Sequence, residues 1–387
     1  MNIKFIPLLI IFFFVVFLTK MHGQEIGANF NHNPEIIDFY YLEKTGVHWV
    51  RTTPRILDYV NGTLKLADDE GLAKIVEAGE KGYDIAFGFR WDFKMHNMRI
   101  PKPGSKEEKR LFDTQRKIME KVGPHVKIFK LGNEPNLETL SVDMHPDKKG
   151  KIPLVKFMIR QLEMVVEPYY ASHSELAKPQ IYIGSFPRLF DPEMQKLPAV
   201  VELIKLSHAS DKIDGLSVHL HISKLSQIDE SFEFVREIMP KKPIIVPEFS
   251  LHRLYLQKID ENISATKEGM AFATKYGRDP DLKIYEWCEI ANTKGVSMEE
   301  WRDMFYSRSW FPKHYLNKYK EAYTKYGVVL ATFPLLQQSC PEDMTKNSPM
   351  WFVNPVFCQK SLLKQPNGDF SPNPLVYDDF VEWASEK

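Results

Sequence analysis

The chain alternates between short apolar runs and longer segments in which apolar residues recur with a helical period. The short runs are rich in Ile, Val, Phe and Tyr and are bounded by Gly, Pro or polar residues, which is typical of buried strands. This pattern predicts eight strands, which are Glu25–Phe30, Val47–Thr52, Tyr83–Phe89, Val126–Leu131, Gln180–Ser185, Gly215–Leu220, Pro243–Glu248 and Gly327–Phe333.

Helical patterns lie between the predicted strands. The first opens on a Pro, as helix starts prefer, and the second is followed by Gly82, which favours a left-handed C-cap. The predicted helices are Pro34–Lys44, Leu72–Lys81, Glu107–Lys121, Pro153–Tyr169, Pro198–His208, Gln227–Ile238 and Leu375–Ser385. Strands that alternate with helices favour parallel pairing and right-handed crossovers, so eight such units predict an α/β fold, a closed (β/α)8 TIM barrel.

The connection after the seventh strand is unusually long, since it runs from Ser250 to Tyr326. Helical patterns recur within it at Ala265–Tyr276 and Ser297–Ser307. It holds three of the seven tryptophans, which are Trp287, Trp301 and Trp310. Long ordered connections in compact domains are usually functional. We therefore expect residues 251–326 to form a large rim insertion that builds one wall of a cleft, with a purely structural insertion as the alternative.

The N-terminus has the three-part pattern of a secretory signal peptide. Lys4 supplies a positive charge, an apolar run extends from Phe5 to Leu18, and a polar stretch ends at Gln24. The run is shorter than the roughly 20 residues that span a bilayer, although an uncleaved anchor is the alternative. We expect residues 1–24 to be removed, residues 25–387 to form the barrel, and the mature protein to be secreted or periplasmic without a membrane anchor.

Charge and cysteine content narrow the classes of partner. The formal net charge is zero, which gives no electrostatic footprint for nucleic acid. An oxidising compartment permits one bridge among the three cysteines. Cys340 and Cys358 flank one loop-like segment and are the expected pair, which leaves Cys288 as a buried thiol. No Cys/His spacing suggests structural zinc, and we expect a monomer.

Two glutamates come directly after apolar runs of strand length. Glu134 follows Gly132-Asn133 at the end of the fourth strand, and Glu248 follows Pro247 at the end of the seventh. The C-terminal strand ends of a parallel barrel face the active site, so acidic residues there are typical of catalysis. Two carboxylates that face one cleft are the minimum equipment for cleaving a glycosidic bond. The alternative is a pair of salt-bridge partners on the barrel rim.

The run Gly132-Asn133-Glu134-Pro135, together with Glu248 on the seventh strand, resembles the clan A glycoside hydrolases. The resemblance covers the barrel but not the long seventh connection. It implies a (β/α)8 barrel that cleaves with retention of configuration. By this resemblance Glu134 is the general acid/base, Glu248 is the nucleophile, and Asn133 hydrogen-bonds the sugar 2-hydroxyl. Such a mechanism needs no metal or other cofactor.

The same resemblance draws attention to the second and sixth strands. Arg51 resembles the strand-two arginine that keeps the clan's nucleophile ionised, since a cation within ~4–6 Å lowers a carboxylate pKa; Arg55 competes for this role. His219 and His221 are two residues apart and point the same way from a strand. Several clan members carry Tyr at the position of His221, so the nucleophile's hydroxyl partner stays open. We expect histidines that contact the sugar or orient the nucleophile, with zinc ligation or core packing as alternatives.

Other strand ends carry candidate substrate contacts. Arg90 and Trp91 end the third strand and could bind an acidic or bulky sugar, although Trp91 could equally cap the barrel core. Trp351 could reach back through a loop to floor the subsite at the scissile bond. Asn31 and His32 after the first strand are weaker candidates of the same kind.

Within the seventh connection, Trp287 is the best candidate for stacking on a sugar face. The predicted function is retaining hydrolysis of a β-linked oligo- or polysaccharide outside the cytoplasm. One alternative is a glycan-binding barrel without turnover. Another is a metal-dependent hydrolase that uses His219 and His221.

Overall fold

The computed structural model describes residues 24–386, so the predicted signal peptide lies outside the described residues apart from Gln24. A closed barrel of parallel strands forms its centre, with each strand paired to the next and the first paired to the last. All eight predicted strands are confirmed. They are β1 (Glu25–Asn29), β2 (Trp49–Thr52), β3 (Asp84–Gly88), β4 (Val126–Leu131), β5 (Gln180–Pro187), β6 (Gly215–His221), β7 (Ile244–Ser250) and β8 (Val328–Pro334).

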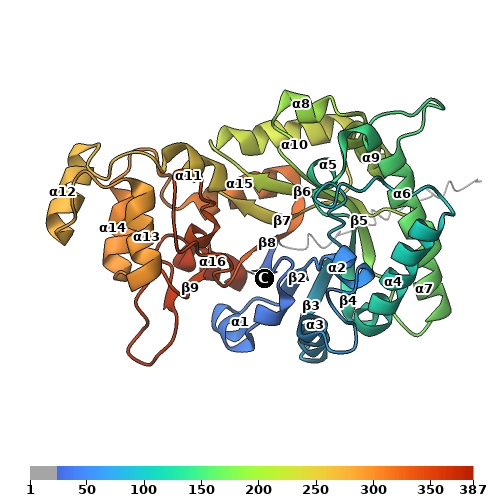
Figure 1. The fold of residues 1–387 in the computed structure, drawn as a ribbon, viewed down its shortest axis with the longest axis horizontal. Helices are drawn as coiled ribbons and strands as arrows, with labels where there is room; N and C mark the ends of the chain where they lie inside the picture. Colours follow the sequence, from blue (N-terminus) through green and yellow to red (C-terminus); the bar gives the residue numbers. More distant parts are fainter. Residues whose placement is uncertain (1–23, 387) are drawn as a thin grey trace, which may run out of the picture.

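Helices cover the outside of the barrel (Figure 1). Between the first seven strands they are α1 (Phe39–Thr45), α3 (Glu70–Glu80), α4 (Lys106–Val122), α6 (Pro153–Gln161), α7 (Glu167–Ser172), α9 (Pro198–Ala209) and α10 (Ser226–Ile238). A π-helical turn at Leu162–Val166 joins α6 to α7. The predicted helix Pro34–Lys44 is split, because the Asp38 side chain caps a new helix by accepting from the Tyr40 N–H.

The segment after β7 forms a group of helices beside the barrel (Figure 1). α11 (His252–Lys258) leads into a helical lobe of α12 (Lys267–Tyr276), α13 (Ile284–Lys294) and α14 (Met298–Tyr306), and α15 (Tyr315–Tyr326) returns to the barrel. The sequence patterns located α12 and α14 but missed the other three helices. The insertion proper therefore ends before α15, which packs against α10 and β8 as the barrel's own helix.

A second long connection, residues 335–376, follows β8. It contains the short helix η5 (Trp351–Val353) and the strand pair β9 (Phe357–Cys358) and β10 (Ser371–Pro372), and it ends at α16 (Tyr377–Ser385). Val296 pairs with Leu362, and the Ser361 hydroxyl donates to Asn292 Oδ1 at 2.9 Å. This strand-eight connection therefore ties the helical lobe to the barrel.

The structure contradicts the predicted disulfide. Cys288, Cys340 and Cys358 are all free thiols. Burial raises the pKa of the Cys358 thiol well above its ordinary value. A disulfide needs a specific separation and orientation of the two Cβ atoms, which position on either side of a loop does not supply. Within residues 24–386, no helix combines the length and apolar character needed to cross a membrane.

Candidate active site

The C-terminal strand ends carry an unusual concentration of left-handed backbone. Residues other than Gly rarely adopt a positive φ, and those that do so gather at functional sites. Four such residues follow barrel strands, and they are Asn31, Asp92, Glu134 and Arg188, while Ser185 lies at an irregularity within β5. At Glu134 the φ of 37° turns the chain sharply at the start of the short helix α5 (Pro135–Glu138).

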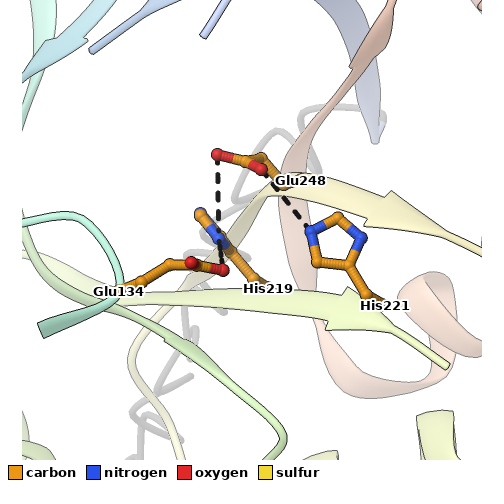
Figure 2. A group of neighbouring side chains, drawn as sticks. All are labelled: Glu134, His219, His221 and Glu248. Atoms are coloured by element: carbon orange, nitrogen blue, oxygen red, sulfur yellow. Dashed lines mark hydrogen bonds and ion pairs between the residues drawn. The ribbon is translucent and has the colours of Figure 1, made fainter. Parts of the chain in front are cut away.

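Glu134 and Glu248 face one another across the barrel mouth (Figure 2). One oxygen of each lies within 4.8 Å of the other. His219 lies between them, with Nδ1 3.2 Å from Glu134 Oε1 and 3.8 Å from Glu248 Oε1. His221 Nε2 is 3.5 Å from Glu248 Oε2. A register shift after Ser217 aligns His219 with Glu248 across β6 and β7, so a local irregularity aims these side chains at one another.

Arg51 connects Glu248 on one side of the site to Asn133 on the other. Its side chain is fully buried, and Nη1 donates to Glu248 Oε1 at 2.7 Å. The same nitrogen donates to Asn29 Oδ1 at 2.8 Å and to the Asn31 side chain, while Nη2 donates to Asn133 Oδ1 at 2.7 Å. Arg51 therefore contacts residues from β1, β4 and β7 at once.

The surroundings of Glu248 favour its charged form. Burial raises the pKa of this carboxyl, but the neighbouring His219, the cation of Arg51 and the nearby His221 outweigh burial and hold the pKa well below its usual range. Burial lowers the pKa of His219 although both carboxylates raise it. Glu248 is accordingly an ionised carboxylate at neutral pH, as a nucleophile must be.

Asn133 is held in a fixed orientation. Its Oδ1 accepts from Arg51, and its Nδ2 donates to Glu138 Oε1 at 2.8 Å. An amide nitrogen carries two N–H groups, so one remains available toward the cavity that Asn133 lines. This placement suits the predicted contact with a sugar hydroxyl.

Sequence reasoning missed several buried polar groups beneath the site. Asn29 supports Arg51, and Glu138 supports Asn133. Lys130 is fully buried, donates to Thr53 Oγ1 at 3.2 Å, and has its pKa lowered well below the ordinary value by burial. Lys127 and Lys130 are three residues apart in one strand and so lie on opposite faces, which is a signal that could have been used.

A cavity of about 540 Å³ opens over the two glutamates. Its lining residues are Asn31, His32, Asn33, Arg90, Asn133, Glu134, His221, Glu248, Pro334, Gln338, Ser339, Pro349, Trp351 and Pro355. None of them belongs to residues 251–326, so the prediction that the rim insertion builds the cleft wall is wrong. The strand-eight connection builds this wall instead.

Trp351 reaches the cavity through that connection. Its side chain is 37% exposed. One ring face is covered by His252, which stacks at 3.5 Å between centroids with an interplanar angle of 5°, and His221 meets the ring at 4.9 Å in an edge-on arrangement. The insertion therefore contributes to the cavity indirectly, through His252 on α11.

Two predicted sugar contacts are buried away from the cavity. Trp287 is fully buried in the helical lobe, where it packs against Trp301 and its indole N–H donates to Glu300 Oε1 at 3.0 Å. Trp91 is 3% exposed and stacks on Phe93 with 5.7 Å between centroids. The predictions that Trp287 and Trp91 bind substrate are wrong, because neither offers a free ring face.

Arg90 lines the cavity together with Glu134 and Glu248. Its Nε donates to Asp92 Oδ1 at 2.8 Å and lies 3.0 Å from Glu138 Oε1. Arg55 donates to the other Asp92 oxygen at 2.9 Å. Arg55 therefore bonds Asp92, just after β3, and not Glu248. Of the two arginines that the sequence offered as the partner of Glu248, Arg51 makes this contact.

The same four side chains shown in Figure 2 could also hold a metal ion. One ligand atom from each of Glu134, His219, His221 and Glu248 lies within 4.8 Å of all the others. Two imidazoles and two carboxylates are a donor set that Zn²⁺ accepts. Arg51 opposes a cation here, because its guanidinium already donates to Glu248 Oε1.

No protein-family model and no curated protein matches the sequence. Solved structures do match the fold. The beta-glucosidase from Thermotoga maritima in complex with azafagomine has a TM-score of 0.51 at 11% sequence identity, over 90% of this chain and 86% of that chain. The Thermobacillus composti GH10 xylanase has a TM-score of 0.48 at 13% identity, over 94% of this chain and 97% of that chain. The chain therefore has an eight-stranded parallel barrel, the fold that it shares with this beta-glucosidase.

Proposed function

We propose that the protein is a secreted or periplasmic retaining glycoside hydrolase that cleaves a β-linked oligo- or polysaccharide with Glu134 and Glu248. The observation that carries the proposal is the pairing of two carboxylates in one cavity, with oxygens within 4.8 Å. An oxygen–oxygen separation this short is compatible with the roughly 5–5.5 Å between carboxyl groups that suits direct attack by one carboxylate.

The proposed reaction has two displacements. The Glu248 carboxylate attacks the anomeric carbon while Glu134 gives its proton to the departing glycosidic oxygen. Glu134 then takes a proton from water, which attacks the same carbon and releases Glu248. Arg51 keeps the nucleophile charged. His219 Nδ1 lies within hydrogen-bonding reach of Glu134 and helps to orient it.

The test is hydrolysis of a broad panel of β-linked plant and algal polysaccharides, measured by release of reducing ends. Wild type should degrade at least one member, and Glu248→Ala and Glu134→Ala should each lose most of that activity. Glu120→Ala is the matched control, because Glu120 is an exposed residue whose ion-pair partner is His173 on the outside of the barrel. If no polysaccharide is degraded, or if Glu248→Ala retains wild-type turnover, the proposal fails.

A metal-dependent hydrolase is the second candidate function, and the cluster of two histidines and two glutamates is the observation that favours it. It would place a Lewis acid where the first proposal places a nucleophile. Dialysis against a chelator distinguishes the two. The two-glutamate mechanism predicts unchanged activity, whereas a metal-dependent enzyme would lose activity and recover it on addition of Zn²⁺.

A further inference from the structure

The guanidinium of Arg90 is only partly used by the protein. Its Nε is engaged by Asp92 and Glu138. Among residues 24–386, no hydrogen bond engages Nη1 or Nη2, and neither atom is among the buried polar atoms that lack a partner. The side chain is 27% exposed and lines the cavity with both glutamates. The terminal nitrogens Nη1 and Nη2 of the guanidinium therefore present N–H donors to the cavity.

The backbone holds Arg90 in place. Its N–H donates to Pro54 O at 3.0 Å, and its carbonyl accepts from Ile56 N at 3.1 Å. These bonds join the end of β3 to the segment after β2. With Nε also anchored, the terminal donors have a fixed direction before any ligand arrives, which reduces the entropy cost of binding.

Several ionisable groups surround Arg90 on its wall of the cavity. Arg55 and Arg90 share the single carboxylate of Asp92. Burial raises the pKa of Glu138 to about 8, so this neighbour is mostly protonated at neutral pH. His32 stands on the same wall and is neutral there, because burial and the two arginines lower its pKa to about 4. Arg90 therefore keeps its positive charge on a wall where His32 is neutral and where Asp92 is shared with Arg55.

We propose that Arg90 binds an anionic group on the sugar, either a uronic-acid carboxylate or a sulfate ester, and that the substrate is an acidic glycan. A planar guanidinium fork matches two oxygens of either group and forms charge-assisted hydrogen bonds with them. For cleavage, the inference rests on the proposed glycoside hydrolase function; for binding, it stands on the cavity alone.

The experiment compares glycans that differ only in charge. The probes are poly-β-mannuronate and hyaluronan beside their carboxyl-reduced forms, and carrageenan beside its desulfated form. Binding is measured by affinity electrophoresis with Glu134→Gln, which prevents turnover. At least one charged polymer should bind more tightly than its neutral form. The pair that shows this preference identifies carboxylate or sulfate as the group recognised.

Adding Arg90→Gln should weaken binding of the charged polymer about ten- to a hundredfold and leave the neutral form unaffected. Arg90→Lys should retain part of the preference, since it keeps the charge but loses the fork. Arg116→Gln is the matched control, because Arg116 lies on the outer helix α4 and pairs with Asp113. Circular dichroism of each variant verifies the fold.

The inference is overturned if no charged polymer is preferred over its neutral form, or if Arg90→Gln keeps the preference. Its failure is separable from failure of the proposed function. Hydrolysis by wild type of a neutral glycan with no charge preference would overturn the inference alone. An Arg90-dependent charge preference without hydrolysis of any polymer by wild type would overturn the hydrolase proposal alone.

Discussion

At the mouth of the barrel, two carboxyl groups of the same residue type sit in different surroundings. Glu248 accepts a hydrogen bond from Arg51 and lies against His221. Within the described part of the chain, Glu134 has His219 as its one side-chain hydrogen-bond partner. Such asymmetry assigns different roles to two otherwise equal groups. The surroundings of Glu248 hold its carboxyl ionised.

Removal of the nucleophile gives the first prediction. Glu248→Ala should lower kcat by several orders of magnitude, because no carboxylate remains to attack the anomeric carbon. Added azide should occupy the vacated space and yield a glycosyl azide of inverted configuration, identified by NMR. Glu134→Ala is the contrasting variant, since its intact nucleophile should lead to an azide of retained configuration. An inverted azide from both variants would contradict the assignment.

Arg51 provides a prediction about pH. Its cation lowers the pKa of Glu248, so Arg51→Met should raise that pKa and move the acidic limb of kcat/KM toward higher pH. Arg51→Lys retains a cation and should move the limb less. Thermal denaturation of both variants verifies folding, because Arg51 is buried. An acidic limb that stays at the wild-type pH in a folded Arg51→Met would show that another group keeps Glu248 ionised.

Among the elements, the barrel strands were easy to predict and the connections were not. A short run such as Ile244-Ile245-Val246 is apolar and buried on both faces, which marks a strand that lies between the barrel core and the outer helices. The role of Trp287 depends on contacts with α12 and α14, which its own segment does not reveal. Trp351 faces the cavity because α11 places His252 behind it.

The two tryptophans should therefore respond differently to truncation. Trp287→Ala should lower the free energy of unfolding by about 3–5 kcal/mol and leave KM unchanged, because a large core side chain is lost far from the cavity. Trp351→Ala should raise KM with a smaller loss of stability, since its ring lines the cavity and is partly exposed. Chemical denaturation and steady-state kinetics separate the two effects. A raised KM in Trp287→Ala at unchanged stability would reverse this view of the lobe.

For the whole molecule, the alternation of strands and helices was enough to predict the barrel, and strand-end position was enough to select both glutamates. The support beneath them was not predictable, because it joins residues distant in the sequence. Glu138 reaches Arg90 from the fourth strand end, and Asn29 reaches Arg51 from the first. Trp91 was ambiguous for the same reason, since only the tertiary fold places Phe93 and Phe157 against its ring.

The free energy of unfolding should depend on pH through Glu138. Its pKa is raised from an ordinary 4.5 to about 8 by burial, so between these values the folded state holds a proton that the unfolded state releases. The resulting stability is present below the lower value and is lost as pH rises through the upper one. Glu138→Gln lacks this titration, so its free energy of unfolding relative to that of wild type should rise by up to about 1.4 kcal/mol for each unit by which the pH increases across this window. Denaturant unfolding from pH 5 to 8 measures it, and a constant difference would contradict the prediction.

The anomeric configuration of the first product tests the central claim most directly. Proton NMR during hydrolysis of a polysaccharide found in the panel distinguishes the two anomers before mutarotation mixes them. Double displacement by Glu248 and water predicts that the β-anomer appears first, in the configuration of the bond that was cleaved. Initial release of the α-anomer would require a single displacement by water, and the assignment of Glu248 as a nucleophile would then be wrong.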